Sequence, residues 1–382
     1  MLSGKKANIM RKKRTKICFV LIALIGISIG CSNKDKKVYT PIDSKPLYAK
    51  GFSFSKYNNF DVININDPWD SLANPTRVVL YHDAENIGHL PEGYKKLQIP
   101  VKNVITLSGT QIAFFNKLDN IEVVCGIDNI NYVTDSVLKV SLGDIVEVGE
   151  PGNFSVEQML SVSPDIVMVS PFKNQNFNTL EETGIFIFPF ADYLETHPLG
   201  RTEWIKVIGA LLDKKNAADS IFIETMNNYN TLLQQAASTT ARPTIVSSKP
   251  FGGIWYMPGG GSYMAKLFTD AGAKYMLQDD DHVGSVSLDF EAVYAKGSEA
   301  DYWRLLVMDN DKYTYEKLQQ EDERYTDFKA FKEKKVFVCN ASKVAYYNMG
   351  AIEPDIILSD LIKIFHPELL DNYTPKYYKL LK

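Results

Sequence analysis

The sequence predicts an α/β protein in which two α/β lobes with mostly parallel central sheets are joined by one long rigid helix. Segments of strand and helix composition alternate on both sides of a central region. That central region carries apolar residues three to four positions apart, which is typical of helices. With 382 residues, of which 45% are apolar, the chain is long enough to bury two cores.

Basic residues crowd the first 16 positions, and an apolar run over 17–29 follows them. The run is too short to span a bilayer comfortably, and it ends in a small residue before Cys31, so a secretory signal is predicted. A cysteine in this place resembles the lipobox of bacterial lipoproteins, which implies that Cys31 is acylated. Ser28 departs from the aliphatic residue of the lipobox, and an ordinary signal or a single anchor helix is the alternative.

A polar, Pro-containing stretch after Cys31 is typical of a tether between an anchor and a folded domain. Either Met1 or Met10 can be the start of the signal. We therefore expect a signal peptide at 1–31, a tether at 32–46, an N-terminal α/β lobe at 47–195, connecting helices at 196–240 and a C-terminal α/β lobe at 241–382.

Strand-like and helix-like segments follow one another in both lobes. In the first lobe we expect a hairpin of 61–66 and 76–81, strands at 101–107, 121–127, 165–170 and 184–190, and helices at 109–118 and 155–162. In the second lobe we expect strands at 244–248, 302–308 and 335–340, and helices at 262–270, 289–295 and 354–365.

The stretch YLETHPLGRTEWIKVIGALL, residues 193–212, gathers charged residues before an apolar-periodic run. A catalytic interpretation makes His197 a base, but a proline directly after it suits the first turn of a helix. No nucleophile or second histidine at metal spacing accompanies it. We therefore interpret the stretch as a hinge and helix start, in which Arg201 pairs with Glu195 or Glu203.

A second helix follows the pause at 213–216, with Asn216 as its expected cap. Its buried stripe runs to about Ala237. Roughly 22 residues at a rise of 1.5 Å make a rod of about 33 Å, long enough to connect two lobes.

Several classes of protein are not favoured by the sequence. The net charge of −4, without a basic cluster beyond the N-terminus, is unlike a nucleic-acid binder. No GxSxG, HExxH or P-loop motif occurs, so we expect neither an enzyme nor a cofactor. Cys125 and Cys339 lie in strand-like runs and are expected in the core. Two polar clusters could suggest a metal: His82 with His89, and residues 279–282. We interpret both as surface loops, so no metal site is expected.

Ligand contacts are expected in loops that follow the carboxyl ends of parallel strands, where α/β folds place their crevices. The glycines of the predicted loop 249–261 suggest a phosphate cradle as one alternative. Aromatic residues at its tip instead suit a large, partly apolar ligand, because flat rings stack on macrocycles or catechols. The candidate ligand contacts are Ser108, Thr110, Tyr132, Phe172, Lys173, Tyr193, Trp255, Tyr256 and Tyr346, with Tyr347 as a weaker candidate.

Three segments carry a family resemblance that extends from about Val101 to the C-terminus. VKNVITLSGTQIAFFNKL, VGEPGNFSVEQMLSVSPDIVMV and, more weakly, VSLDFEAVYAKGSEADYWRLLV resemble the substrate-binding proteins of ABC importers for ferric siderophores, haem or cobalamin. The middle segment is the most specific, since it carries the Gly, Asn, Glu, Pro-Asp signature at Gly149, Asn153, Glu157, Pro164 and Asp165. In the third, the sequence over 298–301 departs from the simpler Pro-Asp pattern.

The resemblance implies a class III periplasmic binding protein with a ligand cleft between its lobes. Such a protein captures a metal chelate, which is a siderophore, haem or a corrinoid, and delivers it to an ABC transporter permease. By the same resemblance, Glu157 and Glu291 would contact the permease. Asp289 is the alternative to Glu291 as the docking carboxylate of the C-terminal lobe. It implies a monomer, lipid-anchored to a membrane of the cell envelope on the periplasmic side. The scarcity of arginines favours corrinoids slightly. The alternative is a lipid-anchored adaptor that uses the same fold to bind another protein.

Overall fold

A computed structural model describes residues 41–382, apart from 71, 88–89, 91, 151–152 and 174–176. The predicted signal peptide, Cys31, most of the tether and His89 lie outside the described residues. No helix in the described part of the chain is both long and apolar enough to cross a membrane.

The N-lobe, our name for the part that carries strands β1 to β10, contains two five-stranded sheets within the described residues. The first has the order β1-β2-β3-β4-β5 and is antiparallel except between β4 and β5. The predicted hairpin is confirmed as β3 and β4, but the rest of this sheet was not predicted. Its strands are β1 (Ile42–Ser44), β2 (Phe52–Lys56), β3 (Asp61–Ile65), β4 (Thr76–Tyr81) and β5 (Tyr94–Gln98).

The second sheet of the N-lobe is parallel throughout, in the order β10-β9-β6-β7-β8. Its central strands β6 and β9 are short, almost fully apolar and buried along their whole length, as is typical of a parallel sheet covered on both faces. The strands are β6 (Val104–Thr106), β7 (Val124–Ile127), β8 (Val146–Glu147), β9 (Ile166–Val169) and β10 (Ile187–Pro189), and the helices are α1 (Gly109–Lys117), α2 (Ser136–Leu142), α3 (Val156–Ser161) and α4 (Asn178–Glu181).

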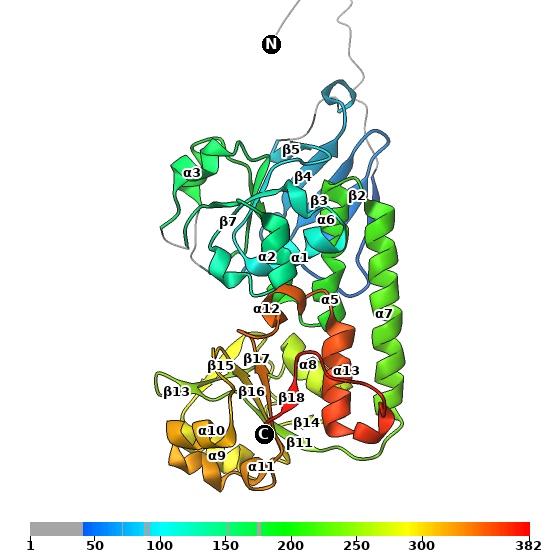
Figure 1. Ribbon diagram of the computed structural model, residues 1–382. Helices are drawn as coiled ribbons and strands as arrows, with labels where there is room; N and C mark the ends of the chain where they lie inside the picture. The colour runs from blue at the N-terminus through cyan, green and yellow to red at the C-terminus, as the bar shows by residue number, and fades with distance from the viewer. Residues whose placement is uncertain (1–40, 71, 88–89, 91, 151–152, 174–176) are drawn as a thin grey trace, which may run out of the picture. The chain divides into compact units, whose positions relative to one another are not determined.

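Three helices connect the two lobes: α5 (Pro198–Glu203), α6 (Ile205–Leu211) and α7 (Lys215–Ala237). The rod α7 begins one residue before the expected cap Asn216, and no side chain caps it. Its 23 residues extend about 34 Å. Figure 1 shows α7 running from the level of β2 and α6 down to the level of α13.

The C-lobe, which carries β11 to β18, has a sheet in the order β14-β11-β16-β17-β18, parallel except for β18, and a small antiparallel sheet β12-β13-β15. The main strands are β11 (Thr244–Ser247), β14 (Lys274–Tyr275), β16 (Tyr302–Val307), β17 (Val336–Asn340) and β18 (Lys379–Leu380). The helices are α8 (Tyr263–Asp270), α9 (Phe290–Gly297), α10 (Tyr315–Glu321), α11 (Lys329–Lys332), α12 (Tyr346–Met349) and α13 (Pro354–Phe365).

The stretch 249–261 is not the loop that the sequence predicted. It forms the hairpin of β12 (Pro250–Phe251) and β13 (Ile254–Pro258), which pairs onward with β15 (Ser285–Leu288). Gly252 and Gly253 make its turn with φ angles of 58° and 83°, a region that favours glycine. A structured hairpin fixes which of its side chains face the core.

One continuous hydrophobic core joins the sheets of both lobes through α5, α6, α7 and α13. Cys339 on β17 is fully buried in it, and Cys125 on β7 is half-buried against a smaller core of the N-lobe. The continuity matters for function, because lobes that share a core move less easily than lobes tied by a linker. The predicted fold class, two α/β lobes and a long connecting helix, is confirmed.

Candidate ligand-binding site

The charged cluster at 193–212 is a structural clamp. Glu203 accepts hydrogen bonds from the backbone N–H groups of residues 47–49, and Glu195 accepts them from residues 50–51 and from the indole of Trp204. Both carboxylates are buried. The expected pairing of Arg201 with either glutamate is therefore wrong, since both are occupied by the chain that enters the N-lobe.

His197 begins helix α5, as the sequence predicted. Its Nδ1 accepts a hydrogen bond of 3.1 Å from the backbone N–H of Leu199, so the imidazole serves as the N-cap. Burial lowers the pKa of His197 to about 4. A neutral ring with an acceptor at Nδ1 suits a cap, because a protonated ring has no acceptor to offer.

Arg201 joins the two lobes. Its Nη2 lies 2.9 Å from Oδ2 of Asp192 in the N-lobe, and its guanidinium lies 4.5 Å from the ring centre of Tyr263 at the start of α8. Burial raises the pKa of the Asp192 carboxyl, while Arg201 opposes that shift. We take the pair as ionised, because the guanidinium is hydrogen-bonded directly to the carboxylate.

The loop after β6 faces the C-lobe, as expected, but its hydroxyl groups contact protein. Ser108 caps α1 by accepting from the N–H of Thr110 at 3.4 Å. The hydroxyl of Thr110 donates to the carbonyl of Tyr347 at 2.8 Å. The Ser108 hydroxyl can still donate its proton and the Thr110 hydroxyl can still accept, so both stay predicted ligand contacts.

Aromatic side chains follow three other strands of the N-lobe: Tyr132 and Phe172 are exposed, and Tyr193 is half-buried. Tyr132 is 45% exposed and its hydroxyl donates to Glu150 at 2.9 Å. Phe172, which is 53% exposed, lies 5.5 Å from the ring of Tyr193, so the structure brings these two candidates together. The Tyr193 hydroxyl donates to the carbonyl of Pro171, and burial raises the pKa of Tyr193 to about 12. Lys173 next to this pair is exposed.

Trp255 is a core residue, contrary to the expectation that it contacts the ligand. Its side chain is fully buried, and its indole N–H donates to the carbonyl of Ser247 at 2.9 Å. The rings of Trp303 and Phe328 each lie 5.9 Å away. Its strand neighbours point the other way, because side chains alternate along a strand. Tyr256 is 42% exposed and Ile254 is 41% exposed.

Tyr346 is also buried, against the rings of Tyr377 and Tyr378 at 5.7 Å. It therefore offers little surface to a ligand, contrary to expectation. The weaker candidate, Tyr347, is 46% exposed. The two tyrosines are adjacent on α12, so only the packing of this short helix decides which of them faces solvent.

The two proposed docking carboxylates both lie in the first turn of a helix. Ser155 caps α3 by accepting from the N–H of Gln158, which leaves Glu157 exposed. Asp289 caps α9 by accepting from the N–H of Ala292 at 2.7 Å, so it is engaged in the helix end. The side chain of Glu291 is 80% exposed and lies 3.9 Å from Arg324.

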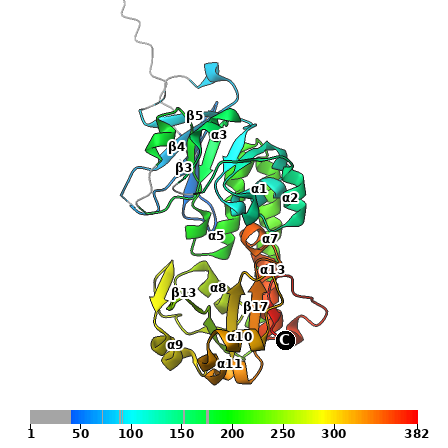
Figure 2. The same ribbon diagram turned by 60° about the vertical axis from the view of Figure 1, so that its left-hand side comes forward.

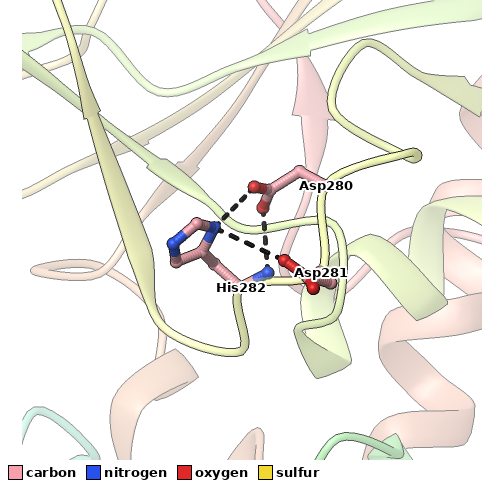
Figure 3. A group of neighbouring side chains, drawn as sticks. All are labelled: Asp280, Asp281 and His282. Carbon is pink, nitrogen blue, oxygen red and sulfur yellow. Dashed lines mark hydrogen bonds and ion pairs between the residues drawn. The ribbon is translucent and has the colours of Figure 1, made fainter.

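Among the described residues, one group of acidic and histidine side chains is close enough to suggest a cation: Asp280, Asp281 and His282. Figure 3 shows that Asp280 holds the loop together, with Oδ1 at 2.6 Å from Nδ1 of His282. Its other oxygen accepts from the N–H of Gly260 at 3.0 Å. The fully exposed carboxylate of Asp281 lies 3.9 Å from the same Nδ1 of His282. The group lies in a surface loop, where the sequence placed it, and the expectation that it holds no metal stays a prediction.

The glycines at 259–261 are explained by this same loop. Their three N–H groups donate to Gly284, to Asp280 and to His282, so they form no open cradle for a phosphate. A Cβ on Gly260 would lie 2.1 Å from the carbonyl oxygen of Leu277, which only glycine avoids.

The exposed aromatic and aliphatic side chains thus come from both lobes. Figure 1 shows β15 on the side of the C-lobe that faces the N-lobe and α12 between the lobes, and Figure 2 shows β13 on that same side of the C-lobe. Flat, partly polar rings of this kind stack on large planar ligands. The contributing residues are Tyr132 and Phe172 from the N-lobe and Ile254, Tyr256 and Tyr347 from the C-lobe.

Comparison with known proteins agrees with this architecture. A family model described as "Periplasmic binding protein" matches residues 104–342. An uncharacterized lipoprotein of Methanocaldococcus jannaschii is 25% identical over 399 residues, which cover 94% of this chain and 94% of the relative.

Two solved structures with the same fold have low sequence identity. A periplasmic haem-binding protein from Pseudomonas aeruginosa has a TM-score of 0.56 and 15% identity, over 70% of this chain and 93% of that chain. A protein described as an ABC-type Fe3+-hydroxamate transport system, from Saccharomonospora viridis, has a TM-score of 0.55 and 18% identity, over 70% of this chain and 94% of that chain.

Proposed function

Because this chain belongs to the periplasmic binding protein family, we propose that it captures a metal chelate between its lobes and delivers it to an ABC transporter permease. The ligand class in this proposal is a ferric siderophore, haem or a corrinoid such as cobalamin. The haem and Fe3+-hydroxamate proteins that share the fold support this class. The N-lobe begins with β1 (Ile42–Ser44), inside the stretch 32–46 that the sequence assigned to the tether. The proposal otherwise retains the division, with the N-lobe ending at 195, connecting helices at 196–240 and the C-lobe at 241–382.

One observation carries the choice of ligand. Both lobes present exposed rings, after strands in the N-lobe and on β13 and α12 in the C-lobe, and the most exposed of the candidate rings are Phe172 and Tyr347. A chelate wraps its metal in organic donor atoms, so its receptor needs apolar and aromatic surface and no metal ligands of its own. The staple formed by Asp280 and His282 is then free of any role in capture.

Capture uses a largely preformed cleft in this proposal. The shared core and the rod α7 restrict motion of the lobes, so the shape change on binding is modest. Docking then depends on Glu157 and Glu291, one exposed carboxylate on each lobe, which pair with arginines of the permease. Each exposed pair is weak, but two on one rigid body reinforce each other.

We further propose that Cys31 carries lipid and holds the protein, as a monomer, on the outer side of a cell membrane, in the periplasmic space of the envelope. The name of the Methanocaldococcus jannaschii relative, a lipoprotein, supports the anchor. Mass spectrometry of the N-terminal peptide from the native membrane tests this directly. A diacylglyceryl group on Cys31 is expected, and an unmodified chain that begins upstream of Cys31 contradicts it.

Titration of the purified protein with cobalamin, haem and a panel of ferric siderophores tests the main proposal. The absorption band of one chelate should shift with saturation at one ligand per chain and a dissociation constant of micromolar or below. If no chelate saturates, the proposal fails, and the alternative of a lipid-anchored adaptor that binds another protein takes its place.

A further inference from the structure

The side chain of Asn348 on α12 is fully buried, although it belongs to a helix of only four residues. All its polar contacts cross to the N-lobe. Its Oδ1 accepts from the N–H of Thr134 at 2.9 Å and from the hydroxyl of Thr134 at 3.1 Å. Its Nδ2 donates to the carbonyls of Gly109 and Tyr132, both at 3.2 Å. The two donors and two acceptor sites of this amide are therefore all used.

Neighbouring contacts extend the same connection. Thr110 donates to the carbonyl of Tyr347, and Thr202 of helix α5 donates to the carbonyl of Ala351, both at 2.8 Å. Gly109 leaves no spare room, since a Cβ there would lie 2.7 Å from Nδ2 of Asn348. We call Asn348 and its partners Gly109, Tyr132 and Thr134 the interlobe latch.

The latch is sensitive to the position of one lobe relative to the other. Hydrogen bonds weaken steeply when distance and angle depart from their optimum, and four of them converge on one amide. A small rotation between lobes would leave this buried amide without partners, which is costly. Apolar contacts between the lobes carry no such directional requirement, so the latch specifies an angle that the core alone does not.

The latch also lies beside the expected ligand loops. Gly109 follows β6, and Tyr132 belongs to the loop after β7. The ring of Tyr132 is one of the exposed candidates for ligand contact. Any change of the latch therefore moves the ligand surfaces of the two lobes relative to each other. Preorganised binding surfaces bind a ligand more tightly, because binding then carries no free-energy cost of arranging them.

We propose that Asn348 is a positioning residue for ligand capture. By hydrogen bonding to Gly109, Tyr132 and Thr134 of the opposite lobe, it fixes the separation of the two lobes at the value that fits the ligand. The part of the proposal that concerns affinity rests on the proposed function. The part that concerns lobe geometry does not, and it is measured without any ligand.

The first test is the distance between the lobes in Asn348→Ala. Spin labels are attached through a non-natural amino acid at Lys139 on α2 and at Lys296 on α9, both exposed, so that the native cysteines are untouched. Pulsed electron resonance should give one narrow distance distribution for the parent protein and a broader or shifted one for Asn348→Ala. An unchanged distribution in Asn348→Ala overturns the latch.

Tyr347→Phe is the matched control on the same helix. It keeps the backbone carbonyl that accepts from Thr110, and the parent distribution is expected. Thermal unfolding of each variant separates a loosened latch from a damaged lobe. A fall in melting temperature without any change in the distance distribution would show a merely structural role and overturn the proposal.

Gly109→Ala approaches the latch from the opposite lobe. Its methyl group should push Nδ2 away and broaden the distribution, as Asn348→Ala does. In the double variant the amide is gone, so the methyl group should add nothing further. Additive effects of the two changes would mean that Gly109 and Asn348 act separately, which contradicts the latch.

Affinity is measured with whichever of cobalamin, haem or the ferric siderophores binds the parent protein. If the binding-competent geometry falls to about a tenth of the population, the apparent dissociation constant rises about tenfold in Asn348→Ala. An affinity equal to that of the parent, with a broadened distance distribution, contradicts the role in capture. Absence of binding to the parent protein overturns the proposed function, whereas the distance measurements still decide the latch.

Discussion

The guanidinium of Arg201 lies 4.5 Å from the ring centre of Tyr263, which places a buried cation of α5 on an aromatic residue of α8. The same guanidinium is hydrogen-bonded to Asp192, whose side chain is 3% exposed. The chain contains seven arginines, and this one holds the connecting helices against both lobes.

Replacing Arg201 should therefore destabilise the fold. In Arg201→Met the carboxylate of Asp192 stays buried without its partner, and a loss of about 3–5 kcal/mol in the free energy of unfolding is expected. Urea unfolding followed by circular dichroism measures it. Arg324→Ala is the control, because the Arg324 side chain is 55% exposed and the expected loss is below about 1 kcal/mol. Equal losses in the two variants would contradict the role of Arg201.

Glu203→Gln should release the chain that enters the N-lobe. The glutamine keeps one oxygen for the three N–H groups of residues 47–49 and turns an NH2 group toward them. We expect a loss of about 2–3 kcal/mol. Hydrogen exchange should accelerate first at residues 47–49. Glu157→Gln, an exposed change of the same kind, should leave both measurements unaltered.

The stability of the fold should fall as the pH falls from about 6.5 to about 4. His197 has an unfolded pKa of 6.5, and burial lowers its pKa to about 4 in the folded protein. The unfolded chain therefore takes up the proton first, and the loss grows through this window to about 2–3 kcal/mol before it levels off below the folded pKa.

The variant His197→Asn isolates this contribution, because asparagine caps a helix without titrating. Urea unfolding of both proteins at several pH values gives the comparison. The difference in stability between parent and variant should change across the window and be constant above pH 7. A difference that is independent of pH would show that His197 does not titrate as stated.

Substitutions of Tyr256 and Trp255 should affect different properties, chelate affinity in one case and stability in the other, although the two residues are neighbours in the sequence. Tyr256→Ala removes an exposed ring, so chelate affinity should fall about tenfold with little change in melting temperature. Trp255→Phe removes a buried hydrogen bond and core volume, so the melting temperature should fall while affinity holds. Chelate titration and calorimetry of both variants provide the measurements, and the reverse result would place the ligand elsewhere.

Glu157 and Glu291 should matter only when the permease is present. Alanine at either position should leave chelate affinity unchanged and reduce uptake in membrane vesicles or cells, with the double variant the most impaired. Asp289→Ala tests the rival of Glu291, because Asp289 is also exposed although its carboxylate caps α9, and loss of this cap costs about 1 kcal/mol of stability. Uptake that falls in Asp289→Ala but not in Glu291→Ala would make Asp289 the docking residue of the C-lobe. Uptake unaffected by the double variant would exclude both residues from docking.

Local patterns in the sequence were enough for most elements. The hairpin of β3 and β4, the helix starts near Ser155 and Ser262, and the bounds of α13 follow from alternation, polar residues at helix ends and proline, all of which act within a few positions. The family resemblance between 101 and the C-terminus is likewise a property of short motifs. These features need no knowledge of which segments meet.

The tertiary structure decided what those patterns leave open. Alternation shows that Trp255 and Tyr256 face opposite sides of a strand, but only the packing of the small sheet against α9 and the main sheet decides which side is core. The contact of Arg201 with Tyr263, the two glutamates that hold residues 47–51, and the contacts of Asn348 join positions up to about 240 residues apart. Contacts at such separations depend on how the lobes pack, and no local pattern in the chain records that packing.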